Sequence, residues 1–212
     1  MNPASNPFAP GAGTQPPELA GRDAILSRAQ LALERTKNSR SARSQLLLGL
    51  RGVGKTVLLN KINDLAEEAG YLTLVLEAPE GRRLAEMLVP PLRRVLHKLS
   101  RSDQAREVAR RGLAVLRAFA SAFKLSAGDI EFGIAAETGT ADSGDLESDL
   151  PELFVAVARA AKAAGRAVAL VIDEVQYLSQ DDLAALIVAV HKIGQKSLPL
   201  VVFGAGLPQL AA

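Results

Sequence analysis

The sequence predicts an α/β fold in three layers, with a parallel sheet flanked by helices on both faces. Four short apolar runs recur along the chain, and segments with helical periodicity separate them; the runs are residues 45–48, 72–76, 168–172 and 200–203. Apolar strands without alternation are typical of parallel sheets that are buried on both faces. A glycine-rich loop follows the first run and leads straight into a helix-forming segment.

The composition indicates one folded domain. A length of 212 residues suits a single α/β domain, and 48% hydrophobic residues argue against global disorder. No apolar run approaches the roughly 20 residues that span a bilayer, so we expect no membrane partner. The chain has no cysteine, which excludes disulfides, thiolate metal sites and cysteine nucleophiles and favours a cytoplasmic location.

The N-terminal part is expected to start with an extended arm over residues 1–17, because this segment is rich in proline and small residues. Helical periodicity then predicts a helix over 22–37. After the strand at 45–48, we expect a second helix over 55–69, ended by Gly70.

The middle segment, about 80–148, is expected to be an insertion of helices and an acidic loop. The pattern is helical over 81–124, with expected breaks at Pro90-Pro91 and at Ser102-Asp103, which resembles a helix cap. Alternation over 129–134 predicts a small exposed strand, and 135–148 reads as a loop.

The C-terminal part contains two expected helices. Asp149 is expected to cap the first, with Glu152 completing a capping box and Gly165 ending the helix. Ser179 is expected to cap the second, which lies between the last two strands.

Residues 49–56 read Gly-Leu-Arg-Gly-Val-Gly-Lys-Thr and match the phosphate-binding loop pattern. The glycines allow successive N–H groups to converge on one point, and the following helix adds its positive N-terminal end. Lys55 can bridge the β- and γ-phosphates, and the Thr56 hydroxyl can bind magnesium. We therefore expect ATP and Mg²⁺ as cofactors. The expected phosphate-side residues are Gly49, Leu50, Arg51, Gly52, Val53, Gly54, Lys55, Thr56 and Val57.

Asp173 and Glu174 follow a buried strand, at the edge of the sheet where ligands of parallel α/β folds bind. Asp173 is expected to hold magnesium through water, beside Thr56, and Glu174 to orient and polarise the attacking water. Lys55 and Glu174 are thus the predicted catalytic residues. Gln176 and Tyr177, just beyond, either line the site or pack in the core. No Asn-Lys-x-Asp motif occurs, which excludes a typical GTPase.

The charge distribution is uneven and leaves two interpretations open. Residues 82–117 hold ten Lys or Arg and three acids, whereas 126–152 hold eight acids and no Lys or Arg. Such runs usually form solvated surfaces. They can also form a basic surface for a nucleic acid or an acidic partner.

These motifs together resemble AAA+ ATPases. Residues 17–23, Pro-Glu-Leu-Ala-Gly-Arg-Asp, resemble the adenine-side box, which implies that Leu19 and Arg22 pack near the adenine. Residues 171–178 and 198–208 resemble the second Walker motif and next strand of the origin-recognition-like and transposition-helper branches. The resemblance implies an AAA+ core over 18–212, with strand 200–203 between the phosphate-loop strand and the Asp173 strand.

The sequence departs from the AAA+ pattern in two ways. Gly204-Ala205-Gly206 stand where relatives carry a polar sensor residue, so no sensor can be assigned. The sequence stops at Ala212, which implies a core truncated before the last strand, arginine finger and helical lid. The implied function is slow ATP hydrolysis that drives a conformational change in a partner or DNA, in a homo-oligomer or with a partner protein. The alternative is an ATP-dependent switch with negligible turnover.

Overall fold

The structure is a computed structural model that describes residues 22–125 and 135–211. The expected arm over 1–17 and the expected strand over 129–134 lie outside the described residues, and so does Leu19. Within the described residues, every other predicted strand and helix has a counterpart.

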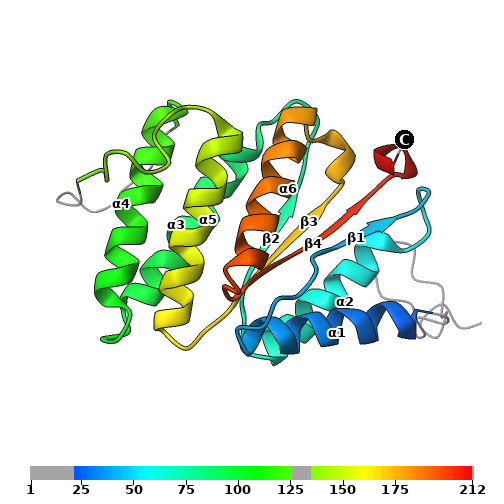
Figure 1. Cartoon of the computed structure of the whole chain (residues 1–212). Helices are drawn as coiled ribbons and strands as arrows, with labels where there is room; N and C mark the ends of the chain where they lie inside the picture. The colour runs from blue at the N-terminus through cyan, green and yellow to red at the C-terminus, as the bar shows by residue number, and fades with distance from the viewer. Residues whose placement is uncertain (1–21, 126–134, 212) are drawn as a thin grey trace, which may run out of the picture.

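Four parallel strands form the centre of the fold, in the order β1-β4-β3-β2 (Figure 1). Their bounds are β1 Gln45–Leu48, β2 Leu72–Glu77, β3 Val168–Asp173 and β4 Leu200–Gly206. β4 lies between β1 and β3, so the strand order implied by the resemblance is confirmed. All four strands therefore end at the same edge of the sheet.

Helices cover both faces of this sheet, which confirms the three-layer α/β fold (Figure 1). The helices are α1 Asp23–Lys37, α2 Lys55–Glu68, α3 Leu84–Ser100, α4 Arg106–Ala122, α5 Leu146–Ala163 and α6 Gln180–Gln195. α1 and α2 pack on one face, whereas α3 and α6 pack on the other and α4 packs against α3 and α5. Two short 3₁₀ turns complete the order, η2 Val175–Tyr177 and η3 Pro208–Ala211.

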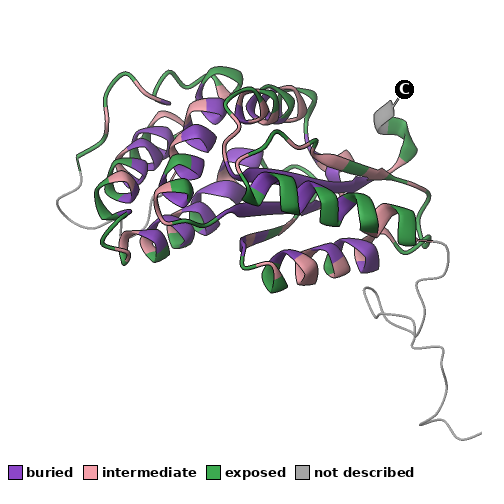
Figure 2. Ribbon diagram, turned by 60° about the horizontal axis from the view of Figure 1, so that its bottom comes forward, coloured by how far each residue is buried: buried purple, intermediate pink, exposed green. Residues whose placement is uncertain are grey.

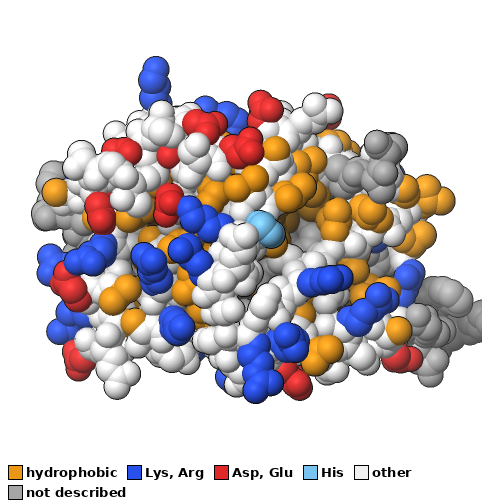
Figure 3. All heavy atoms as spheres, in the orientation of Figure 1, with side chains coloured by type: hydrophobic (Ala, Val, Ile, Leu, Met, Phe, Trp, Pro, Cys, Tyr) orange, Lys and Arg blue, Asp and Glu red, His pale blue; other side chains and the backbone are white. Residues whose placement is uncertain are grey.

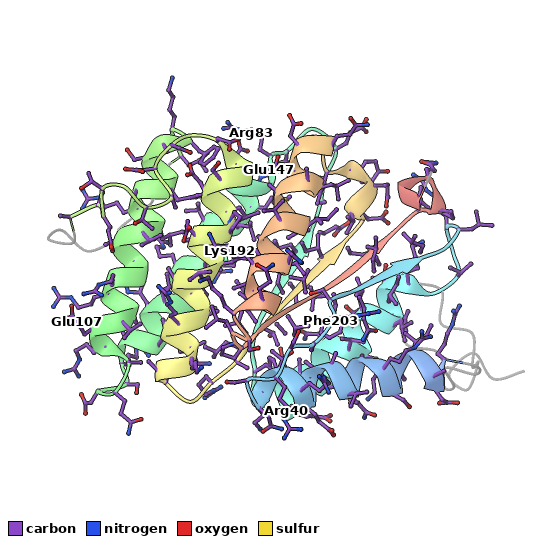
Figure 4. All side chains as sticks on the ribbon, in the orientation of Figure 1. Arg40, Arg83, Glu107, Glu147, Lys192 and Phe203 are labelled. Carbon is purple, nitrogen blue, oxygen red and sulfur yellow. The ribbon has the colours of Figure 1, made fainter. Side chains whose placement is uncertain are left out.

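The sheet separates two apolar cores, one on each of its faces. Ala169 and Val171 of β3 pack in the core under α1 and α2, whereas Leu170 and Ile172 pack in the core under α3 to α6. Successive side chains of a strand point to opposite faces, so a strand buried on both sides must be apolar at every position. Figure 2 shows buried residues along the strands and the inner sides of the helices. Phe203 of β4, fully buried, is labelled in Figure 4.

α3 continues through Pro90-Pro91, so the expected break there is wrong. A proline inside a helix costs roughly 3 kcal/mol through its missing N–H and its clash with the preceding turn. Leu88, Leu92 and Leu96, on either side, are almost completely buried. Burying one such side chain contributes roughly 1.5–3 kcal/mol, so the apolar face of α3 outweighs the two prolines.

The expected caps of α4 and α5 are also wrong. α4 starts at Arg106 after Ala105, and Asp103 forms an ion pair with Arg106 at 2.6 Å rather than capping the helix with Ser102. α5 starts one turn earlier than expected, because the cap is Asp145 and not Asp149.

Asp145 caps α5 through its carboxylate, which accepts a hydrogen bond from Ser148 N–H at 3.0 Å. The hydrogen bond from the Ser148 side chain holds the pKa of Asp145 below its ordinary value. Asp149 lies inside the first turn, buried, and accepts hydrogen bonds from Ser143 and Gly144. It therefore fixes the preceding loop to the helix.

α5 and α6 pack side by side (Figure 1). Glu152 of α5 does not complete a capping box but forms an ion pair with Lys192 of α6, which is labelled in Figure 4. Ser179 does cap α6, as expected: its Oγ accepts a hydrogen bond from Asp182 N–H at 3.1 Å. The Ser179 cap and the ion pair with α5 thus fix the position of α6, which follows β3 in the sequence.

Candidate functional site

The glycine-rich loop connects the end of β1 to the start of α2. Gly52 and Gly54 have φ of 78° and 82°, in the left-handed region. A Cβ at either glycine would meet no atom within 4 Å, so the backbone angle and not the available space requires glycine there. Gly54 is the N-cap of α2, and no side chain caps this helix. The N–H groups of the first turn are thus left for another acceptor.

Lys55 lies over this loop. Its Nζ donates hydrogen bonds to the carbonyl oxygens of Gly49 and Leu50, each at 2.9 Å. The first turn of α2 contains no acidic residue, so the positive charge of Lys55 adds to the positive end of the helix. This combination of loop N–H groups, helix end and ammonium favours a multiply charged anion.

Thr56 and Asp173 lie in contact although 117 residues separate them in the sequence. The Thr56 hydroxyl donates to Asp173 Oδ2 at 2.6 Å, and Asp173 Oδ1 accepts from the backbone N–H of Glu174 at 2.8 Å. Both side chains are partly buried. The structure therefore brings together the two residues that the sequence predicted as magnesium ligands.

The donor set fits Mg²⁺. A hydroxyl and a carboxylate are hard oxygen ligands, and Mg²⁺ usually takes one or two protein oxygens and completes its shell with phosphate oxygens and water. Within the described part of the chain, no group of three or more His, Cys, Asp or Glu side chains could hold a metal ion. Thr56 and Asp173 would thus hold the ion together with the phosphates and not instead of them.

Glu174 follows β3 with φ of 56°, a left-handed conformation that is uncommon for a residue with a side chain. Such a conformation costs on the order of 1–3 kcal/mol and is concentrated at functional sites. The Glu174 Oε2 atom accepts a hydrogen bond from Gln176 Nε2. The turn after β3 thus holds the predicted base at the same edge of the sheet as Asp173.

The two residues just beyond Glu174 form hydrogen bonds with residues of the candidate site. The sequence had left open whether they line the site or pack in the core. Gln176 contacts Glu174, and the Tyr177 hydroxyl accepts a hydrogen bond from Arg51 of the glycine loop at 3.0 Å. The only sequence signal for these roles is their closeness to the acidic pair. Their partners are set by the tertiary structure.

The expected adenine side is described only at Arg22. Its Nη2 donates to the Val53 carbonyl at 2.9 Å, which joins the start of α1 to the glycine loop. A groove of about 880 Å³ starts beside Arg22, Val53 and Lys55 and continues along β1. This volume is within the range of small-molecule sites, roughly 300–1,000 Å³. The place of the adenine itself stays a prediction.

The other predicted phosphate-side residues differ in exposure. Leu50 and Arg51 are exposed at the tip of the loop, and Val53 is 42% exposed. Val57 is buried in α2, so only its backbone can face a ligand. Gly49 N–H donates to the carbonyl of Gly206 at 3.2 Å, which fixes the loop to the end of β4.

The comparisons with known proteins agree with this geometry. A family model described as an AAA ATPase domain matches residues 18–203, which include the glycine loop, Asp173 and Glu174. Among curated proteins, none matches the sequence of the chain. In residues 22–125 and 135–211, no helix combines the length and the apolar character needed to cross a membrane. The resemblance to particular branches stays a prediction.

Proposed function

The chain belongs to the AAA ATPase family, and we propose that it binds ATP with Mg²⁺ at residues 49–57 and hydrolyses the nucleotide. The contact between Thr56 and Asp173 carries this proposal. It joins the glycine loop to the end of β3, and this supports a nucleotide site at the edge of the sheet where Lys55 and Glu174 also lie.

Each residue has a separate role in the proposed reaction. On nucleotide binding, the Lys55 ammonium exchanges the carbonyls of Gly49 and Leu50 for the β- and γ-phosphate oxygens. Thr56 and Asp173 would hold a magnesium ion, which would supply positive charge against the phosphates. Glu174 accepts a proton from the water that attacks the γ-phosphate, while the bond from the γ-phosphorus to the bridging oxygen breaks and ADP leaves. Arg22 borders the adenine.

The energy of hydrolysis drives a conformational change in a partner or in DNA. The basic segment 82–117 supports a polyanion as one such partner. Over α4 and α5, however, Figure 3 shows basic side chains interspersed with acidic ones. If this segment binds DNA, the affinity for DNA should therefore fall as the salt concentration rises.

A second candidate function is an ATP-dependent switch with negligible turnover. The end of β4 favours it, because Gly204-Ala205-Gly206 offer no polar side chain to a γ-phosphate. The two functions share the nucleotide site and differ only in the rate of hydrolysis.

Phosphate release from ATP by the purified chain separates the two functions. We expect slow release that requires Mg²⁺ and stops with a chelator. Addition of duplex DNA at low salt should raise the rate if DNA is the partner. ATP binding without measurable release in any condition would favour the switch, and turnover of several per second by a monomer would show that nothing further is needed to complete the site.

A further inference from the structure

A larger side chain at Gly204 of β4 would displace the side chains packed against it. A Cβ at this position would lie 2.9 Å from Leu46 Cδ1 and 3.2 Å from Val175 Cγ2. Distances this short force neighbouring side chains to move. The glycine thus lets η2, which contains Val175, pack directly on β4, and this packing brings the side chain after Val175 to the end of the strand.

Gln176 is that side chain, and both ends of its amide have a partner. Its Nε2 donates to Glu174 Oε2, and its Oε1 accepts from the backbone N–H of Leu207 at 3.1 Å. Leu207 is the first residue after β4. The two partners, one acceptor and one donor, together define which way the amide points.

Two hydrogen bonds of Tyr177 hold the turn after β3. Tyr177 accepts a hydrogen bond from Arg51 of the glycine loop, and Tyr177 N–H donates to the Glu174 carbonyl at 3.0 Å. The backbone that carries Gln176 is therefore fixed by the turn, and the Gln176 amide is bonded to the backbone at Leu207. A side chain anchored in this way can orient a third group.

We propose that Gln176 is the positioning residue for Glu174. This inference rests on the proposed role of Glu174 as the base. The Gln176 amide fixes Oε2 of the carboxylate and leaves Oε1 to accept a hydrogen bond from the attacking water. Without the amide, the Glu174 carboxylate turns freely about its side-chain torsions and spends less time against the water.

The first test is Gln176→Met, which keeps the length of the side chain but removes both hydrogen bonds. The rate of ATP hydrolysis in a single turnover should fall roughly 10- to 100-fold, since a misplacement of about 1 Å can cost 100-fold in rate. The affinity for ATP with Mg²⁺ should not change, because Gln176 contacts neither the loop N–H groups nor Lys55. Gln180→Met, at an exposed position on α6, is the matched control and should hydrolyse ATP at the wild-type rate.

Gln176→Glu provides a second variant should the methionine variant fold poorly. The carboxylate still accepts from Leu207 N–H but offers no donor to Glu174. Its rate should also fall. Wild-type rates in either folded variant would overturn the proposal.

A double mutant separates positioning from a general effect on the fold. If Gln176 acts through Glu174, Gln176→Met should cause no further loss of rate when Glu174 is already glutamine. A full additional loss in that background would show that Gln176 acts on something else. If Glu174→Gln alone hydrolyses ATP at the wild-type rate, the proposed base is wrong. If Glu174→Gln is slow and Gln176→Met is not, only the positioning role is wrong.

Discussion

The starts of α2 and α6 make opposite use of the same backbone chemistry. Both helices start close to the carboxyl edge of the sheet, and in both the first N–H groups have no acceptor within the helix itself. At α6, Ser179 caps the helix, and Asp181 and Asp182 supply negative charge. At α2, a left-handed glycine takes the cap position, with no capping side chain and no acid in the first turn.

The difference shows which of the two helix starts serves a ligand. A cation in the first turn of a helix is unfavourable by roughly 0.3–1 kcal/mol, because it opposes the helix dipole. Lys55 occupies that place in α2, and its ammonium is held by two loop carbonyls. The start of α6 is therefore stabilised by its own residues, whereas the start of α2 gains stability when an anion binds. Substitutions at the first turn of α2 and at the facing edge of β3 should affect function, and substitutions of the cap of α6 should affect stability.

Glu174→Gln should have the largest effect on function. The amide keeps the shape of the side chain but cannot take a proton, and loss of a general base typically lowers the rate roughly 100-fold or more. The melting temperature and the affinity for ATP should stay close to wild type. Stopped-flow phosphate release and titration with ATP and Mg²⁺ measure the two quantities, and an equal loss of binding would show that Glu174 is a binding group instead.

Gly54→Ala should lower both stability and ATP affinity. A side chain in the left-handed conformation costs roughly 1–2 kcal/mol, and relief of that strain moves the N–H groups of the loop. Gly70→Ala is a matched control at the other end of the same helix, because Gly70 has φ of 84° and also faces open space. It should lose a similar amount of stability in a urea titration and keep its ATP affinity. Equal losses of affinity in the two variants would contradict a phosphate-binding role for the loop.

Ser179→Ala should lower stability alone. Loss of an N-cap side chain costs about 1 kcal/mol. For a chain of this size, that loss should lower the melting temperature by about 2–4 °C. ATP affinity should match wild type, which a titration at a temperature well below melting can check. A changed affinity would mean that the start of α6 belongs to the nucleotide site.

Asp145→Ala should have the smallest effect, and this effect should depend on pH. The pKa of Asp145 is lower in the folded chain than in the unfolded chain, so its carboxylate stabilises the fold above the unfolded pKa. This contribution is lost as the pH falls through the folded pKa. The difference in melting temperature between wild type and variant should therefore be full at neutral pH and disappear in acid. A difference that persists unchanged in acid would exclude the charged cap as its cause.

The strands and the glycine loop could be predicted because their signals are local. An apolar run without alternation, such as 168–172, predicts a strand in a sheet that is buried on both faces. The glycines of the loop pattern predict the backbone conformation of the loop. The cap of α5 was not predictable in the same way. Asp145 and Asp149 both suit a helix start, and only the contacts of Asp149 with Ser143 and Gly144 decide between them.

The course of α3 and the role of Gln176 depend on residues far away in the sequence. The prolines of α3 are tolerated because the leucines around them are buried by other helices. Gln176 has its second partner 31 residues later, at Leu207, and it reaches that partner because Gly204 allows η2 to approach β4. Local patterns carry no information about such contacts.

Calorimetric titration of ATP with Mg²⁺ into wild type and Lys55→Ala tests most directly whether the start of α2 is the nucleotide site. Wild type should bind one ATP, and Lys55→Ala should bind roughly 10- to 100-fold more weakly, because it loses a charged hydrogen-bond donor to the phosphates. Lys61→Ala, on the same helix but beyond its first turn, should bind like wild type. Wild-type affinity in Lys55→Ala would show that the nucleotide does not bind at the start of α2.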